Sequence, residues 1–152
     1  MSDHVVLVSV SGRDQPGMMS RLMAALQDLE ADILDVGQAV IHNELALAVL
    51  ARVGTVADAR MRVENACASE DVVVRISPVQ SSDKVMWSEF ADANRLIVTV
   101  MALHDGVDAM QAVSELTYQY GLNIDFVRRL TKAPQDIKAA IAPSLCVEMR
   151  VS

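Results

Sequence analysis

The chain has 152 residues, 52% hydrophobic and 22% charged, a balance typical of one ordinary globular domain or two small ones and not of a disordered chain. Its formal net charge of −7 and its 3% aromatic content argue against nucleic-acid binding, which needs basic side chains and stacking surfaces. No apolar run approaches the roughly 20 residues that span a bilayer, so the sequence predicts a cytoplasmic protein without a membrane partner.

The chain opens with a predicted strand over residues 5–10, followed by a loop that contains glycine and proline. From Met18 to Leu29, apolar side chains recur every three or four positions, which indicates a helix with one face toward a core. Asp14 is placed to cap this helix, and Pro16 suits its first turn.

Two further strands are predicted over residues 33–42 and 45–53, joined by a tight hairpin. Thr55, with Asp58 three positions later, looks like the start of a second helix. A fourth strand over residues 72–76 completes the order β-α-β-β-α-β. This is the ferredoxin-like pattern, an α+β fold in which both helices cover one face of a four-stranded antiparallel sheet.

The same layout begins again about ninety residues later. Residues 95–102 predict a strand, and a helix opened by Asp105 and ended by Gly121 follows. Residues 123–131 predict another strand, and a helical turn is expected around residues 136–141, before the last strand. In that last strand, apolar side chains alternate with others at Leu145, Val147 and Met149.

The repeat predicts two tandem ferredoxin-like domains, at residues 1–78 and 94–152, with a linker at 79–93 after Pro78. The second domain lacks its last helix and strand, which favours a longer parent protein. Cys67 and Cys146 lie far apart without metal-ligand spacing, so we expect buried thiols and neither a disulfide nor a metal site.

The strands of the first domain carry apolar side chains on both faces, where a lone sheet of this kind would alternate apolar with polar. Small residues at Gly37 and Ala39 would allow close approach of a partner. Three candidates could cover the exposed apolar face of this sheet: the second domain of the same chain, a missing C-terminal part of the protein, or a second chain. We expect a homodimer, edge to edge or face to face; alternatively, short buried strands simply carry extra apolar residues.

The loop of residues 11–17 is the main candidate site, since it leads from a strand to a helix N-terminus whose free amide groups attract anions. In this prediction the amides hold a carboxylate, Gly17 lets the backbone approach it, and Asp14 holds an ammonium group. These are the two ends of a free amino acid. The alternative is a well-capped turn without a ligand. The candidate ligand-binding residues are Gly12, Arg13, Asp14, Pro16, Gly17, Gln38, Asp105 and Gly106.

Other polar positions have two interpretations. Gln38 and His42 either complete an amino-acid pocket or only bond across the sheet and end a strand. Arg128 and Arg129 form either an anion contact or a solvated strand end. No catalytic motif occurs: there is no G-x-S-x-G elbow, no phosphate-binding loop with its lysine, and no pair of aspartates two apart, so the sequence predicts no enzyme activity and no cofactor for this chain.

These segments resemble a known family. The loop of residues 12–17 resembles the ligand loop of the ACT domain, an amino-acid-binding regulatory fold. Residues 33–42 and 45–47 resemble strands in the N-terminal region of bacterial phosphoserine phosphatases, and so do residues 121–125 with Arg128, Arg129 and Leu130.

The resemblance implies a tandem ACT module, dimeric, that regulates a phosphoserine phosphatase of serine biosynthesis. It implies L-serine, or glycine, as the ligand, bound near the loop glycines at a dimer interface. The Mg²⁺-dependent catalytic domain of the haloacid-dehalogenase type would be absent from this chain. Two alternatives stay open: a free-standing two-ACT regulator of the glycine-cleavage-repressor type, acting through protein contacts, and an assembly device with a vestigial pocket.

Overall fold

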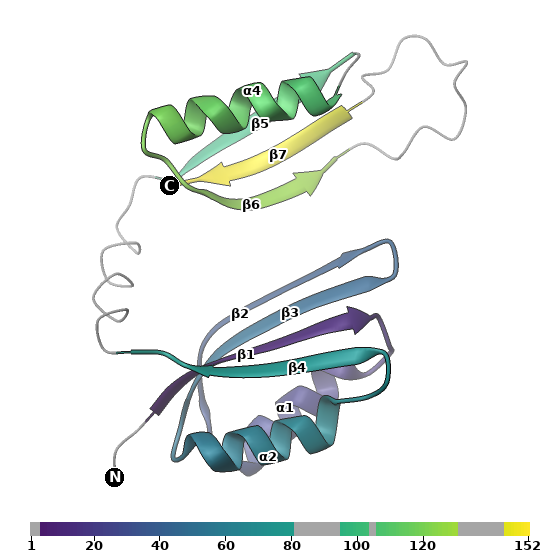
Figure 1. The fold of residues 1–152 in the computed structure, drawn as a ribbon, viewed down its shortest axis with the longest axis vertical. Helices are drawn as coiled ribbons and strands as arrows, with labels where there is room; N and C mark the ends of the chain where they lie inside the picture. Colours follow the sequence, from purple (N-terminus) through teal and green to yellow (C-terminus); the bar gives the residue numbers. More distant parts are fainter. Residues whose placement is uncertain (1–3, 81–94, 104–105, 131–144) are drawn as a thin grey trace. The chain divides into compact units, whose positions relative to one another are not determined.

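The computed structural model describes residues 4–80, 95–103, 106–130 and 145–152 (Figure 1). The chain divides into two compact units, Met1–Val85 (unit 1) and Met86–Ser152 (unit 2). The predicted linker at 79–93 lies almost entirely outside the described residues, as does the predicted helical turn at 136–141.

Unit 1 has the predicted element order, which confirms the ferredoxin-like fold. Its strands form one antiparallel sheet in the order β2-β3-β1-β4, and both helices lie on one face of it (Figure 1). The elements are β1 (His4–Arg13), α1 (Met18–Asp28), β2 (Asp32–Ile41), β3 (Glu44–Val53), α2 (Val56–Cys67) and β4 (Val72–Pro78).

The core of unit 1 lies between the sheet and its helices. Alternate residues of the strands point toward the helices because successive side chains of a strand leave on opposite faces. Leu22 and Leu26 of α1 and Val63 of α2 pack against them and are almost completely buried. Burying side chains of this size contributes about 1.5–3 kcal/mol each. Cys67 is also buried there, and burial raises the pKa of its thiol, while the Arg21 guanidinium acts in the opposite direction.

The other face of this sheet carries small side chains at its centre. The strand register brings Gly37 opposite Ala48, and Ala48 opposite Ser9, on this outer face. Leu50 on the same face is 5% exposed, whereas Leu7 is 37% exposed. Apolar side chains on both faces of the sheet agree with the sequence analysis, and a partner chain as their cover stays a prediction.

The start of α1 corrects one expectation. Its N-cap is Gly17, with a left-handed backbone (φ 83°) and no side-chain cap, so Asp14 does not cap the helix and Pro16 precedes its first turn. The reason is position: Asp14 lies three residues before this N-cap, and its backbone amide donates to the carbonyl of Asn43 at 2.7 Å, which holds it at the hairpin. At α2, by contrast, the Thr55 hydroxyl accepts from the Asp58 amide at 3.1 Å, which confirms the predicted cap.

Unit 2 repeats the first part of this arrangement. Its sheet has the order β5-β7-β6, with α4 on one face (Figure 1). By element order, these strands correspond to β1, β3 and β2 of unit 1. Within the described residues, unit 2 has no counterpart of α2 or β4. The elements are β5 (Leu96–Ala102), α4 (Gly106–Gln119), β6 (Ile124–Arg129) and β7 (Leu145–Val151).

Gly121 follows α4 with a left-handed backbone (φ 68°), which confirms that the helix ends where predicted. The buried core of unit 2 is small: Val100, Val147, Met149 and Val151. On the outer face of its sheet, Arg128 pairs with Glu148 at 3.0 Å, and the Arg150 guanidinium lies 5.6 Å from the Phe126 ring centroid.

Candidate functional site

An open pocket of about 380 Å³ lies at one end of the sheet of unit 1. Three connections meet there: the segment that leaves β1, the hairpin between β2 and β3, and the turn from α2 into β4. Its volume is near the lower end of the range for small-molecule sites. The lining residues are Gly12, Arg13, His42, Asn43, Glu44 and Asp71.

Gly12 allows two backbone segments that line this pocket to approach each other closely. Its φ is 139°, a region that other residues rarely adopt, and a Cβ at this position would collide with the carbonyl oxygen of Asp71. The next amide, of Arg13, donates to that carbonyl at 3.0 Å, and the amide of Asp14 donates to Asn43. Backbone hydrogen bonds therefore join the three connections, and the pocket exists without a ligand.

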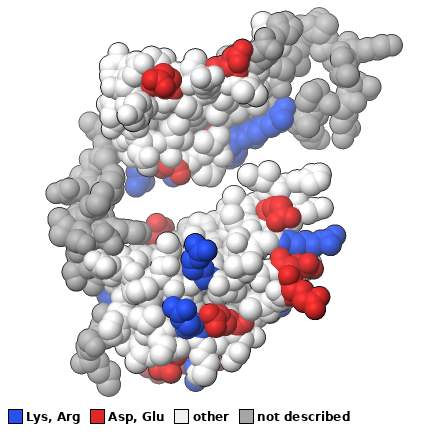
Figure 2. Space-filling view, in the orientation of Figure 1, with Lys and Arg blue, Asp and Glu red and all other residues white. Residues whose placement is uncertain are grey.

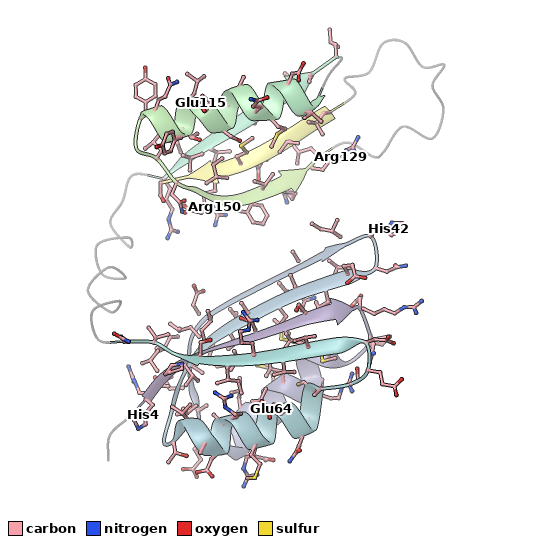
Figure 3. All side chains as sticks on the ribbon, viewed as in Figure 1. His4, His42, Glu64, Glu115, Arg129 and Arg150 are labelled. Carbon is pink, nitrogen blue, oxygen red and sulfur yellow. The ribbon has the colours of Figure 1, made fainter. Side chains whose placement is uncertain are left out.

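The pocket combines charges of both signs. Arg13 brings a guanidinium group, and Glu44 and Asp71 bring carboxylates. Basic and acidic side chains lie close together on the surface of unit 1 (Figure 2). Among the described residues, none of these three side chains forms an ion pair. His42 lies in the hairpin turn beside them, with φ 60° (Figure 3). A small zwitterion fits this arrangement, since its carboxylate needs a cation and its ammonium group needs acceptors.

The structure separates the predicted ligand loop into two parts. Gly12 and Arg13 line the pocket, whereas the loop continues through Asp14 and Pro16 to Gly17 at the start of α1, and none of these three residues lines it. A Cβ at Gly17 would meet only open space, so this residue serves the left-handed turn there.

Gln38 does not line the pocket either. It stands opposite Leu47 in the strand register, and the side chain of Leu47 belongs to the core on the helix face of the sheet. Gln38 therefore points to the helix face of the sheet and is not among the residues that line the pocket.

The second predicted site has a different setting. Asp105 lies outside the described residues. Gly106 is the first residue of α4, and a Cβ there would come within 3.0 Å of the Leu145 side chain. Its small size therefore serves the close packing of helix against strand. Asp71, which closes the pocket of unit 1, belongs to the α2–β4 turn, and that turn has no counterpart in the described part of unit 2.

The sequence analysis missed Asn43, Glu44 and Asp71. The order of the strands in the sheet could have identified these residues, because β1 lies between β3 and β4. The register pairs Arg13 with Glu44 and Gly12 with Val72, directly after Asp71. Pairing the end of β1 with the starts of β3 and β4 would have placed both carboxylates beside Arg13.

Among the described residues, no group of three or more His, Cys, Asp or Glu side chains is placed to hold a metal ion. None of the helices that these residues form has the length and apolar character needed to cross a membrane.

The fold of unit 1 can be compared with known families. Residues 4–70, most of unit 1, match the model of the ACT domain family. Unit 2 is ACT-like in its order of strands and helix.

The chain is also similar to phosphoserine phosphatase SerB2 of Mycobacterium tuberculosis, with 30% identity over 147 residues. The match covers 93% of this chain and 35% of that protein, so the chain spans about a third of the length of this relative. The chain is thus related to the regulatory part of phosphoserine phosphatases.

Two solved structures share the fold along nearly the whole chain. An unknown protein from Galdieria sulphuraria is 16% identical, with a TM-score of 0.70 and coverage of 99% of this chain and 82% of that one. A candidate glycine cleavage system transcriptional repressor is 13% identical, with a TM-score of 0.60 and coverage of 99% and 81%. At these identities, the likeness concerns the fold alone.

Proposed function

We propose that the pocket of unit 1 binds a small free amino acid and that the chain is an amino-acid-sensing regulatory module. The carrying observation is the presence of one guanidinium and two carboxylates, none in an ion pair among the described residues, around an open pocket whose walls are joined by backbone hydrogen bonds. Arg13 binds the ligand carboxylate, and Glu44 and Asp71 accept from its ammonium group.

The proposed ligand is L-serine. Its support is the similarity to a phosphoserine phosphatase, an enzyme whose name implies serine as its product. In this proposal the chain is a cytoplasmic homodimer from serine biosynthesis, and the catalytic domain, with its Mg²⁺, belongs to a part of the parent protein outside this chain. Binding that favours one arrangement of the domains by about 1–3 kcal/mol would suffice for feedback.

Isothermal titration calorimetry tests the proposal. Serine, glycine and a panel of other amino acids are titrated into the chain and into Arg13→Ala. Serine is expected to bind the wild-type chain, and loss of the guanidinium should weaken binding by about 1.5–3 kcal/mol, or roughly 10- to 150-fold, because a charged hydrogen bond is lost.

Arg75→Ala is the matched control. It removes the same charge from unit 1, on the outer face of β4 and outside the pocket lining, and should leave the affinity unchanged. Absence of heat with every amino acid tested, for a folded chain, would contradict the proposal. Equal loss of affinity in both variants would show a general charge effect and would also count against the pocket.

A second candidate function is a free-standing two-ACT regulator that acts through protein contacts. Its support is the fold similarity to the candidate glycine cleavage system repressor over 99% of this chain. The complete gene distinguishes the two: a following domain with a D-x-D motif favours the phosphatase, and a stop codon directly after Ser152 favours the free-standing regulator.

A further inference from the structure

The three connections that meet at the pocket of unit 1 are rich in carboxylates. Residues 12–17, 42–44 and 68–71 contain a single basic side chain, that of Arg13, and four acidic ones, those of Asp14, Glu44, Glu70 and Asp71. All five are exposed, and none forms an ion pair among the described residues. One positive and four negative charges leave these connections with a net charge of −3 when histidine is neutral.

The guanidinium group belongs to a residue with an acidic neighbour on each side. Arg13 stands opposite Glu44 in the register of β1 and β3, and its amide donates to the carbonyl of Asp71 at 3.0 Å. Neighbouring strands lie about 4.8 Å apart, so each acidic residue is one strand spacing away from Arg13. The pocket therefore offers a partner to one anionic group of a ligand and repels a second one.

The other polar groups of the lining do not supply a second cation. Asn43 has a neutral carboxamide, and His42 has an imidazole, which donates one hydrogen bond when it is neutral. The carboxylates of Glu44 and Asp71 only accept hydrogen bonds, and so does a phosphate dianion or an acidic side chain of a ligand. A hydroxyl group, by contrast, can donate to these carboxylates.

We propose that this pocket selects amino acids by charge, so that it accepts those with a neutral side chain and rejects those with an anionic one, O-phosphoserine included. The inference rests on the proposed function, in which Arg13 binds the ligand carboxylate. The phosphate of phosphoserine adds about 1.5 to 2 negative charges at pH 7, which the acidic residues of the three connections repel. The hydroxyl group of serine adds no charge.

This selectivity has a consequence for what the chain senses. The name of the related phosphoserine phosphatase implies phosphoserine as its substrate and serine as its product. The two molecules have the same carboxylate and ammonium group, and they differ by the phosphate. A pocket that rejects the phosphate responds to the product, and accumulated substrate does not compete for it.

Calorimetry with the two ligands tests the selectivity. Serine and O-phosphoserine are titrated into the wild-type chain at about pH 8, above the range in which histidine side chains usually titrate. Phosphoserine should bind at least about tenfold more weakly than serine at about 20 mM salt. The difference should shrink at about 500 mM salt, because salt screens charges that lie several ångströms apart.

Glu70→Gln separates charge repulsion from the binding contacts. Glu70 precedes Asp71 in the chain and does not line the pocket, so the affinity for serine should stay within about twofold of wild type. The affinity for phosphoserine should rise by about two- to fourfold at low salt. Glu30→Gln is the matched control, since Glu30 follows the other end of α1, a helix of 11 residues and about 16 Å. It should change neither affinity.

The possible failures are distinguishable. Phosphoserine that binds as tightly as serine would overturn the inference and leave the amino-acid sensor intact. A difference that persists at high salt would show exclusion by size, and equal effects of the two glutamine variants would show a general charge effect. Either result would also overturn the selection by charge. Absence of heat with serine would instead contradict the proposed function itself.

Discussion

Gly12 is the residue on which the shape of the pocket most depends. Its backbone conformation and its contact with the Asp71 carbonyl both exclude a side chain. The identity of this residue is therefore required by the backbone, whatever ligand the pocket takes.

Replacing it tests this requirement. Gly12→Ala should lower the free energy of unfolding by about 2 kcal/mol or more, because positive φ and overpacking each cost roughly 1–3 kcal/mol. Urea unfolding followed by circular dichroism measures the change. Gly37→Ala is the matched control, since a Cβ there meets only open space, and it should change stability by less than about 0.5 kcal/mol. Equal effects of the two changes would contradict the argument.

At the scale of elements, the two helices of unit 1 begin in different ways. Helix α1 starts from a left-handed glycine without a side-chain cap, whereas α2 has the Thr55 hydroxyl bonded to both the amide and the carboxylate of Asp58. The second helix thus depends on one side chain at its start.

Thr55→Ala should destabilise unit 1 by about 1 kcal/mol, the usual cost of losing an N-cap. The measurement is the urea midpoint at constant slope. Thr55→Ser keeps the hydroxyl and should retain most of the wild-type stability. A serine variant as unstable as the alanine variant would show that the methyl group, and not the cap, is responsible.

The elements of unit 1 were predictable because apolar periodicity and the Thr55 cap are local signals. The start of α1 was mispredicted because the helix begins only after Gly17, while the backbone of Asp14 is held by a hydrogen bond to the hairpin, which is distant in sequence. The same reason applies to the candidate pocket: Gly12 and Arg13 belong to the predicted loop, whereas Glu44 and Asp71 come beside them only through strand pairing. The strands and helices follow from local sequence patterns, but the lining of the pocket depends on the sheet register.

At the scale of the whole molecule, each unit carries one cysteine. Cys67 is buried in unit 1, with a raised thiol pKa, and Cys146 is half-buried in unit 2. Because the thiolate is the reactive form, both burial and the raised pKa slow the reaction of Cys67. The two thiols therefore report on the two units separately.

Iodoacetamide labelling followed by peptide mass spectrometry should show that Cys146 reacts faster than Cys67 in the folded chain. Saturating serine should slow the labelling of Cys67 further, since a bound ligand stabilises the folded unit, and should leave Cys146 unchanged. The denatured chain, in which both thiols react alike, is the control. Equal rates in the folded chain would contradict the separate burial of the two thiols.

The walls of the pocket come from nearly opposite ends of the unit 1 sequence, Gly12 and Asp71, and they meet only when every strand is in place. Any molecule that occupies it therefore binds the intact unit in preference to partly opened forms. A higher concentration of the ligand would then make the protein more resistant to proteolysis. A low concentration would shorten the lifetime of the protein, independently of any signal to another domain.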